Sequence, residues 1–130
     1  KGKRVYNARS ETLLEKPLFG KDFIQNRCVI PVTGFCEWDG DGTGWDFLPQ
    51  EEEMLYLAGV CRKKAEGWEA TVVTEHASGC VGVIHHRTPL ILSGENLRQW
   101  LYDEALARQF LEEAKERVLL KRKKMEGETL

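Results

Sequence analysis

The sequence has no long apolar segment and no strong excess of charge of either sign. No run approaches the roughly 18 apolar residues that a membrane-spanning helix requires. The net charge is -2 and the pI is about 6.0, so any binding of nucleic acid has to come from a local basic cleft. With 130 residues, 42% of them hydrophobic and 31% charged, the chain fits one soluble domain, residues 1–130.

The sequence also lacks an initiator methionine and a signal peptide at its start. The opening Lys1-Gly2-Lys3-Arg4 is not followed by an apolar stretch of the kind that signal peptides contain. We therefore expect a segment to precede Lys1 in the whole protein, and we expect a cytoplasmic location.

The cysteines lack the CxxC spacing of zinc sites, and without an export signal a disulfide framework is not expected. Cys28, Cys36 and Cys61 lie in apolar, strand-like runs, where a free thiol behaves as a small buried hydrophobe. Cys80, which follows Gly79, lies outside such a run. We expect neither a metal nor a cofactor.

The first half of the chain has the pattern of β-structure. Short runs of β-branched or aromatic residues alternate with turn residues, which predicts antiparallel strands. Pro31 cannot donate to a strand ladder and Gly34 has no side chain to pack, so the first two runs are expected to be one strand broken by a bend. The predicted strands are residues 28–33, 35–38, 54–61 and 69–74.

The segment 39–53 is expected to be a solvated hairpin loop. It opens with Asp39-Gly40-Asp41-Gly42, as a calcium loop does, but Gln50 stands at the twelfth position, where such a loop needs a bidentate Glu. After an irregular stretch, residues 83–92 form a predicted apolar strand that two histidines and an arginine interrupt.

The pattern becomes helical from Ser93, a plausible N-cap. Leu97, Trp100 and Leu101 then share one face of a helix. Residues 104–117 predict a second amphipathic helix whose apolar face packs onto the sheet. The basic segment 119–124 is either a last strand or a frayed end.

Glu37 is the first candidate for chemistry, because it lies in a run where an apolar strand would prefer Val or Ile. Strand alternation places it on the face of Phe35 and opposite Cys36. A partly desolvated carboxylate tends to a raised pKa, which suits general acid–base work. The alternative is a solvent-facing Glu at a strand end.

His85 and His86 are consecutive, so on a strand they point to opposite faces and cannot both bind one metal ion. We expect one of them to face a pocket. The alternative is a hydrogen-bonded structural histidine, which is the more common role of a single histidine on a strand.

The polar run from Tyr6 to Thr12 is the third cluster. Asn7 could orient a substrate and Arg9 could grip a phosphate with two hydrogen bonds. An equally good interpretation is a helix N-terminus that Ser10 caps.

Together these three clusters resemble the SOS response-associated peptidase (SRAP) family in order and spacing. Asn7-Ala8-Arg9-Ser10-Glu11-Thr12 is similar to its Asn-Ala-Arg-x-Glu-Thr motif. The run from Arg27 to Trp38 is similar to the family strand that ends Gly-aromatic-x-Glu-Trp. The run from Ile84 to Leu92 is similar to the Ile-His-x-Arg-x-Pro segment. The likeness extends from about Tyr6 to Trp100, which corresponds to the later part of the family domain.

The resemblance implies an α+β fold: a strongly bent, barrel-like antiparallel β-sheet with flanking helices and a positive cleft for single-stranded DNA. The implied partner is single-stranded DNA that contains abasic sites, bound by a monomer during the SOS response to DNA damage. Arg9 and Arg87 are then expected to meet phosphates and Trp38 to stack on a base.

The resemblance also implies a covalent reaction. In the family, removal of the initiator Met exposes a Cys whose amine condenses with the abasic aldehyde and whose thiol then closes a thiazolidine. Glu37 and His85 match the residues that move protons, and Asn7 matches the residue that holds the terminal Cys or the sugar. No residue of this sequence matches the Cys. The same Cys, Glu and His are credited with autoproteolytic removal of the Met.

Two alternatives remain open. A module that binds single-stranded DNA without a covalent bond would need only the arginines and the stacking aromatics. A thiol hydrolase would pair Cys36 or Cys80 with His85, although neither cysteine has an evident electropositive setting.

Overall fold

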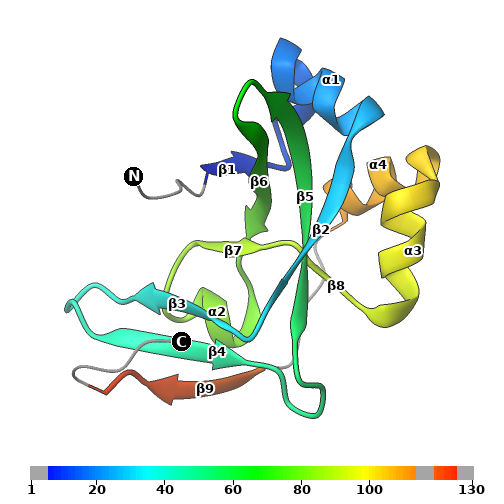
Figure 1. The fold of residues 1–130 in the computed structure, drawn as a ribbon. Helices are drawn as coiled ribbons and strands as arrows, with labels where there is room; N and C mark the ends of the chain where they lie inside the picture. The colour runs from blue at the N-terminus through cyan, green and yellow to red at the C-terminus, as the bar shows by residue number, and fades with distance from the viewer. Residues whose placement is uncertain (1–5, 114–118, 126–130) are drawn as a thin grey trace.

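The computed structural model describes residues 6–113 and 119–125, which form two sheets and a set of helices (Figure 1). The strands are β1 (Tyr6–Arg9), β2 (Arg27–Val32), β3 (Phe35–Trp38), β4 (Gly44–Leu48), β5 (Leu55–Lys64), β6 (Gly67–His76), β7 (Arg87–Pro89), β8 (Ile91–Leu92) and β9 (Leu120–Lys123). The helices are the 3-10 turn η1 (Leu13–Glu15), α1 (Pro17–Gln25), α2 (Gly79–Gly82), α3 (Gly94–Tyr102) and α4 (Glu104–Glu112).

The larger sheet has the order β1-β6-β5-β2, with β7 paired to β6 and β8 paired to β5. All these pairs are antiparallel except β1 with β6, which is parallel. The expectation of a wholly antiparallel sheet is therefore wrong, although the α+β class is confirmed. Parallel neighbours need a long crossover, and the chain between β1 and β6 provides one through α1 and the four strands β2 to β5, two from each sheet.

The smaller sheet has the order β3-β4-β9. The predicted bend near Gly34 is present, and it carries the chain from β2 in the larger sheet to β3 in the smaller one. Strand β4 was not predicted, because residues 39–53 were expected to be one loop. The turn from Asp39 to Thr43 and residues 49–53 match that expectation, and the aromatic residues of β4 explain the strand that lies between them.

The predicted strand 83–92 is wrong at its beginning. The amides of Ile84 and His85 both donate to the carbonyl of Val81, so this segment continues the turn of α2. Strand β7 begins only at Arg87, and Leu90 separates it from β8. The two histidines therefore lie in a turn and not on a strand.

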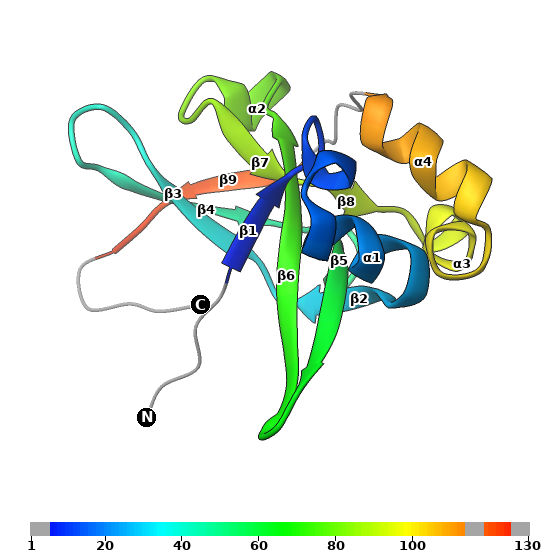
Figure 2. The ribbon, with the colours of Figure 1, turned by 90° about the horizontal axis from the view of Figure 1, so that it is seen from above.

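Helices α1, α3 and α4 cover one side of the larger sheet, while the smaller sheet lies on the other side, with α2 near it beside β7 (Figures 1 and 2). The main core lies under the helices, and the side chain of Trp100 is fully buried in it. A second cluster lies on the opposite face of the larger sheet, where the smaller sheet packs against it. It is formed by Leu55, Leu57, Val72 and Ile91 with Ile30, Val32, Phe35 and Leu119.

The helix ends agree in part with the sequence. Ser93 caps α3, as predicted, through a hydrogen bond from the amide of Asn96 to its hydroxyl. Helix α4 ends at Glu112, and the last residues of the predicted helix 104–117 lie outside the described part. Ser10 does not cap a helix, because Thr12 is the N-cap of η1 and Lys16 that of α1. The amide of Ser10 donates to the carbonyl of Thr74 and extends the pairing of β1 with β6.

Segment 119–124 is a strand, as one of the two predicted alternatives had it. Among the described residues, no helix has the length and apolar character needed to cross a membrane.

Candidate active site

Glu37 and His85 lie together. The Oε1 atom of Glu37 is 3.7 Å from Nδ1 of His85, and the side chains are 25% and 33% exposed. Burial raises the pKa of Glu37, while the nearby His85 acts in the opposite direction and offsets part of the rise. The carboxyl group can therefore hold a proton closer to neutral pH than an ordinary Glu, which a general acid requires.

The turn before β7 fixes the ring of His85. The amide of Arg87 donates to Nδ1 of His85 at 3.1 Å, and the carbonyl oxygen of the same residue lies 3.2 Å from that nitrogen. On its other side the ring stacks on His86, with ring centroids 4.5 Å apart. Contact at Nδ1 leaves Nε2 as the other nitrogen that can exchange a proton.

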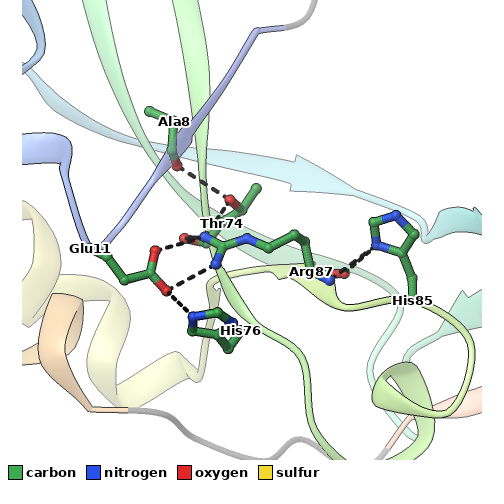
Figure 3. A network of polar contacts seen from close by, with 6 residues as sticks. All are labelled: Ala8, Glu11, Thr74, His76, His85 and Arg87. Atoms are coloured by element: carbon green, nitrogen blue, oxygen red, sulfur yellow. Dashed lines mark hydrogen bonds and ion pairs between the residues drawn. The ribbon is translucent and has the colours of Figure 1, made fainter.

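Arg87 itself is engaged in a polar network (Figure 3). Its two terminal nitrogens donate to the two carboxylate oxygens of Glu11, both at 2.9 Å. One of them also donates to the carbonyl and hydroxyl oxygens of Thr74 at 3.0 Å. The side chain of Arg87 is only 9% exposed, so the guanidinium that was expected to meet a phosphate already has protein partners.

Glu11 was part of a quoted motif but received no role from sequence reasoning. Hydrogen bonds from Arg87 are the main cause that lowers the pKa of Glu11 to about 2. His76 Nε2 also lies 3.2 Å from this carboxylate. No local signal could have found this role, because the partner Arg87 lies 76 residues further along the chain.

Asn7 and Arg9 are exposed on β1, on either side of the buried Ala8. Asn7 is paired with Val72, and paired residues share a face of a sheet. Val72 belongs to the cluster that also contains Phe35 of β3. Asn7 therefore lies on the face of the sheet toward which β3 packs. Among the described residues it makes no hydrogen bond to Glu37 or His85.

Trp38 ends β3 and is 52% exposed. Strand alternation places it on the side of Cys36, opposite Glu37. The basic strand β9 lies beyond β4 in the same sheet, and its Lys121 lies over the ring of Trp45, on the face opposite Trp38. The lysine nearest Trp38 is Lys124, because both side chains approach Gly44. An exposed aromatic ring beside a lysine is the kind of surface on which nucleic-acid bases stack.

Sequence reasoning missed Asp46, a fully buried carboxylate on β4. The thiol of Cys36 donates to it at 2.9 Å and Arg122 at 3.2 Å, and these contacts lower the pKa of Asp46, the Cys36 bond most of all. Burial raises the pKa of Cys36, and Asp46 raises it further. This thiol lies on the face of β3 opposite Glu37, where it donates to the Asp46 carboxylate and has Nζ of Lys124 3.6 Å from its sulfur.

Among the described residues, no group of three or more His, Cys, Asp or Glu side chains could hold a metal ion. The site therefore consists of an acid–base pair, a polar network behind it and exposed cationic and aromatic residues nearby.

An α+β fold with a partly buried Glu–His pair defines a class of candidate acid–base proteins. Comparison with known families is more specific. Residues 1–126 match the family model described as SOS response associated peptidase (SRAP), and the chain belongs to this family.

Curated relatives support the assignment. The chain is 33% identical over 109 residues to abasic site processing protein YoqW of Bacillus subtilis, a match that covers 77% of the chain and 49% of that protein. It is 34% identical over 127 residues to abasic site processing protein HMCES of Gallus gallus, covering 75% of the chain and 38% of that protein. The chain thus spans about half the length of YoqW, and less of HMCES.

Solved structures agree with the fold. A protein from Bacteroides thetaiotaomicron superposes with a TM-score of 0.69 and 28% identity, covering 81% of this chain and 50% of that one. A protein from Bordetella bronchiseptica superposes with a TM-score of 0.76 and 24% identity, covering 92% of this chain and 64% of that one. The second likeness bears on the fold alone.

Proposed function

We propose that this chain forms the acid–base part of a site that processes abasic sites in single-stranded DNA. In the complete protein an N-terminal Cys would form the covalent link, and the protein would act as a monomer. The observation that carries the proposal is the contact between Glu37 and His85, two residues that the family motifs single out and that lie 3.7 Å apart.

The proposed reaction begins when the α-amine of the N-terminal Cys attacks the aldehyde carbon of the ring-opened abasic sugar. The product is a carbinolamine, which becomes a Schiff base when its hydroxyl leaves as water. A protonated Glu37 can give that hydroxyl its proton, and the raised pKa of Glu37 favours this role. The thiol then attacks the imine carbon and closes the thiazolidine ring, and its proton returns to the site.

His85 is proposed to shuttle protons. Its Nδ1 faces Glu37, and its Nε2 is left to exchange a proton with the substrate. Asn7 is proposed to orient the terminal Cys or the sugar from the neighbouring face of the larger sheet. The same Cys, Glu37 and His85 would remove the initiator Met by autoproteolysis.

For DNA binding we propose phosphate contacts from Arg9 and Arg87 and stacking of a base on Trp38. Trp38 and Arg9 are exposed, as such contacts require. Arg87 would have to give up part of its bonding to Glu11 to reach a phosphate. Its share of the DNA contacts is therefore proposed to be smaller than that of Arg9.

The non-covalent alternative draws on the exposed Trp38 and the basic strand β9. A module of this kind would bind single-stranded DNA in a salt-dependent, reversible way and would not need Glu37. The covalent function predicts an adduct with abasic DNA that survives denaturation, and the non-covalent alternative predicts none.

The experiment incubates single-stranded DNA carrying one abasic site with the complete gene product, then resolves the mixture on a denaturing gel after heating. A shifted, heat-stable band is expected, and intact DNA of the same sequence should give none. The chain that starts at Lys1 should bind DNA but form no such band. If a complete product with an N-terminal Cys gives no band, the covalent function is wrong.

A further inference from the structure

We infer that Glu11 is a positioning residue for His85 and that it acts through Arg87. The inference rests on the proposed function, because it assigns a role within the same site. Glu11 follows β1 and does not touch His85. It contacts the side chain of Arg87, whose main chain contacts the histidine ring (Figure 3).

The first step is the anchoring of the arginine side chain. Two parallel hydrogen bonds of 2.9 Å to the Glu11 carboxylate fix the plane of the guanidinium. Two further bonds of 3.0 Å to Thr74 tie the same group to β6. Because the side chain of Arg87 is only 9% exposed, water cannot easily replace Glu11 as its partner.

The second step is the placing of the histidine ring. Arg87 is the first residue of β7, a strand of three residues, where it pairs with His76, and the carbonyl of His86 accepts a hydrogen bond from the amide of Ala77. The side-chain bonds of Arg87 add to these main-chain contacts in fixing its position. Its amide donates to Nδ1 of His85 at 3.1 Å, so the neutral ring carries its proton on Nε2. Its carbonyl oxygen lies 3.2 Å from Nδ1 and can accept a hydrogen bond from this nitrogen when the nitrogen carries a proton.

The consequence is that one residue serves both protonation states of the histidine. When Nδ1 is bare it accepts from the amide of Arg87, and when Nδ1 is protonated it can donate to the carbonyl, or toward Glu37 at 3.7 Å. The ring can therefore exchange its proton without turning over. A shift of Arg87 by a fraction of an ångström would remove this match.

The test replaces Glu11 by Gln in the complete gene product, which keeps the shape of the side chain but removes its charge. Nitrogen NMR of labelled histidines reports which ring nitrogen of neutral His85 carries the proton, with His76→Asn and His86→Asn variants used to assign the signals. The original protein should show the Nε2–H form, and the Glu11→Gln variant a mixture of both forms. Crosslinking should slow by roughly 10-fold to 100-fold, the scale seen when a group that orients a metal-bound histidine is removed.

Two further variants complete the design. Glu15→Gln changes an exposed carboxylate in the same segment and should leave both readouts unchanged. Thr74→Val keeps the shape of the side chain and removes one of the four bonds that anchor Arg87. Thr74→Val should also increase the share of the Nδ1–H form of His85, but by less than Glu11→Gln does. This variant keeps the inference testable if Glu11→Gln does not fold.

The inference is wrong if folded Glu11→Gln and Thr74→Val proteins both keep the original form of His85, since Glu11 would then only stabilise the fold. Failure of the proposed function looks different. In that case the original protein forms no adduct with abasic DNA, while the NMR signals of His85 still respond to Glu11→Gln.

Discussion

Oε1 of Glu37 lies 3.7 Å from Nδ1 of His85, although Glu37 belongs to β3 of the smaller sheet and His85 to the turn that leads into the larger one. The bend between β2 and β3 brings Glu37 and His85 together. It directs β3, which the sequence predicted to continue β2, across the face of the larger sheet. The site therefore depends on how the two sheets are packed, and the cluster around Phe35 and Val72 holds that packing.

The first prediction concerns Glu37→Gln in the complete gene product. Gln keeps the size and hydrogen bonding of Glu37 but has no proton to give, so crosslinking to abasic DNA should slow by roughly 10²-fold to 10⁴-fold. Affinity for intact single-stranded DNA should barely change, since lysines and arginines on phosphates supply most of it. Gel quantification of the adduct and a salt-controlled binding assay measure the two effects separately.

Equal losses in the two assays would assign Glu37 to the fold or to DNA binding instead of proton transfer. Glu69→Gln is a suitable control, because Glu69 lies on β6 away from the site and pairs only loosely with Lys64 at 3.8 Å.

The second prediction is a pH dependence of stability that arises from Glu11. Its pKa is about 2 in the folded chain against an ordinary 4.5, so its pairing with Arg87 stabilises the fold fully above about pH 4.5. This contribution falls as the pH drops toward about 2. The carboxylate is 38% exposed, so solvent screening makes the effect smaller than the pKa difference alone would give.

Urea unfolding of the original chain and of Glu11→Gln at about pH 5 and about pH 3 measures this contribution, because Gln cannot be protonated in that range. The gap in unfolding free energy between the two proteins should narrow at the lower pH. A gap that stays constant would show that the charge of Glu11 does not stabilise the fold.

The sequence predicted the strands best where local pattern and tertiary packing agree. Strand β6 carries a β-branched run and β5 an apolar run, both buried on both faces, and Ser93 caps its helix as its type suggests. The bend after β2 followed from Pro31 and Gly34. Glu37 stood out because an acidic residue interrupted an apolar strand.

The failures have physical reasons as well. Strand β1 pairs in parallel with β6, a long-range choice that no local pattern encodes. Strand β4 was missed because the run Asp39-Gly40-Asp41-Gly42 led us to expect one loop over residues 39–53, and the burial of Asp46 depends on partners from β3 and β9. The same applies to Glu11, whose partner Arg87 is far away in the sequence. Spacing along the chain could not show these contacts.

The third prediction tests whether a cysteine acts as a nucleophile. Burial, together with the nearby Cys61, raises the pKa of Cys28 to about 12, and burial and Asp46 raise the pKa of Cys36. Because the thiolate is the reactive form, native Cys28 and Cys36 should resist iodoacetamide at neutral pH. Mass spectrometry of peptides should show full alkylation of both only after unfolding in urea. Rapid alkylation of native Cys36 would instead favour the thiol hydrolase.

The fourth prediction compares two glycines. A Cβ atom at Gly59 of β5 would lie 2.8 Å from Cδ1 of Ile30, 3.0 Å from the carbonyl oxygen of Thr71 and 3.1 Å from Sγ of Cys28. The Thr71 oxygen belongs to the neighbouring strand β6 and cannot move alone, so Gly59→Ala should cost about 1–3 kcal/mol of unfolding free energy.

Gly94→Ala is the matched control. It places the same methyl group at the first residue of α3, where no atom lies within 4 Å and where Ala favours the helix by up to about 1 kcal/mol. Urea denaturation of the two variants should therefore shift the midpoint in opposite directions. If Gly59→Ala is as stable as the original chain, then β5 can shift relative to β2 and β6 at no cost, and the close packing around Gly59 is not needed for the fold.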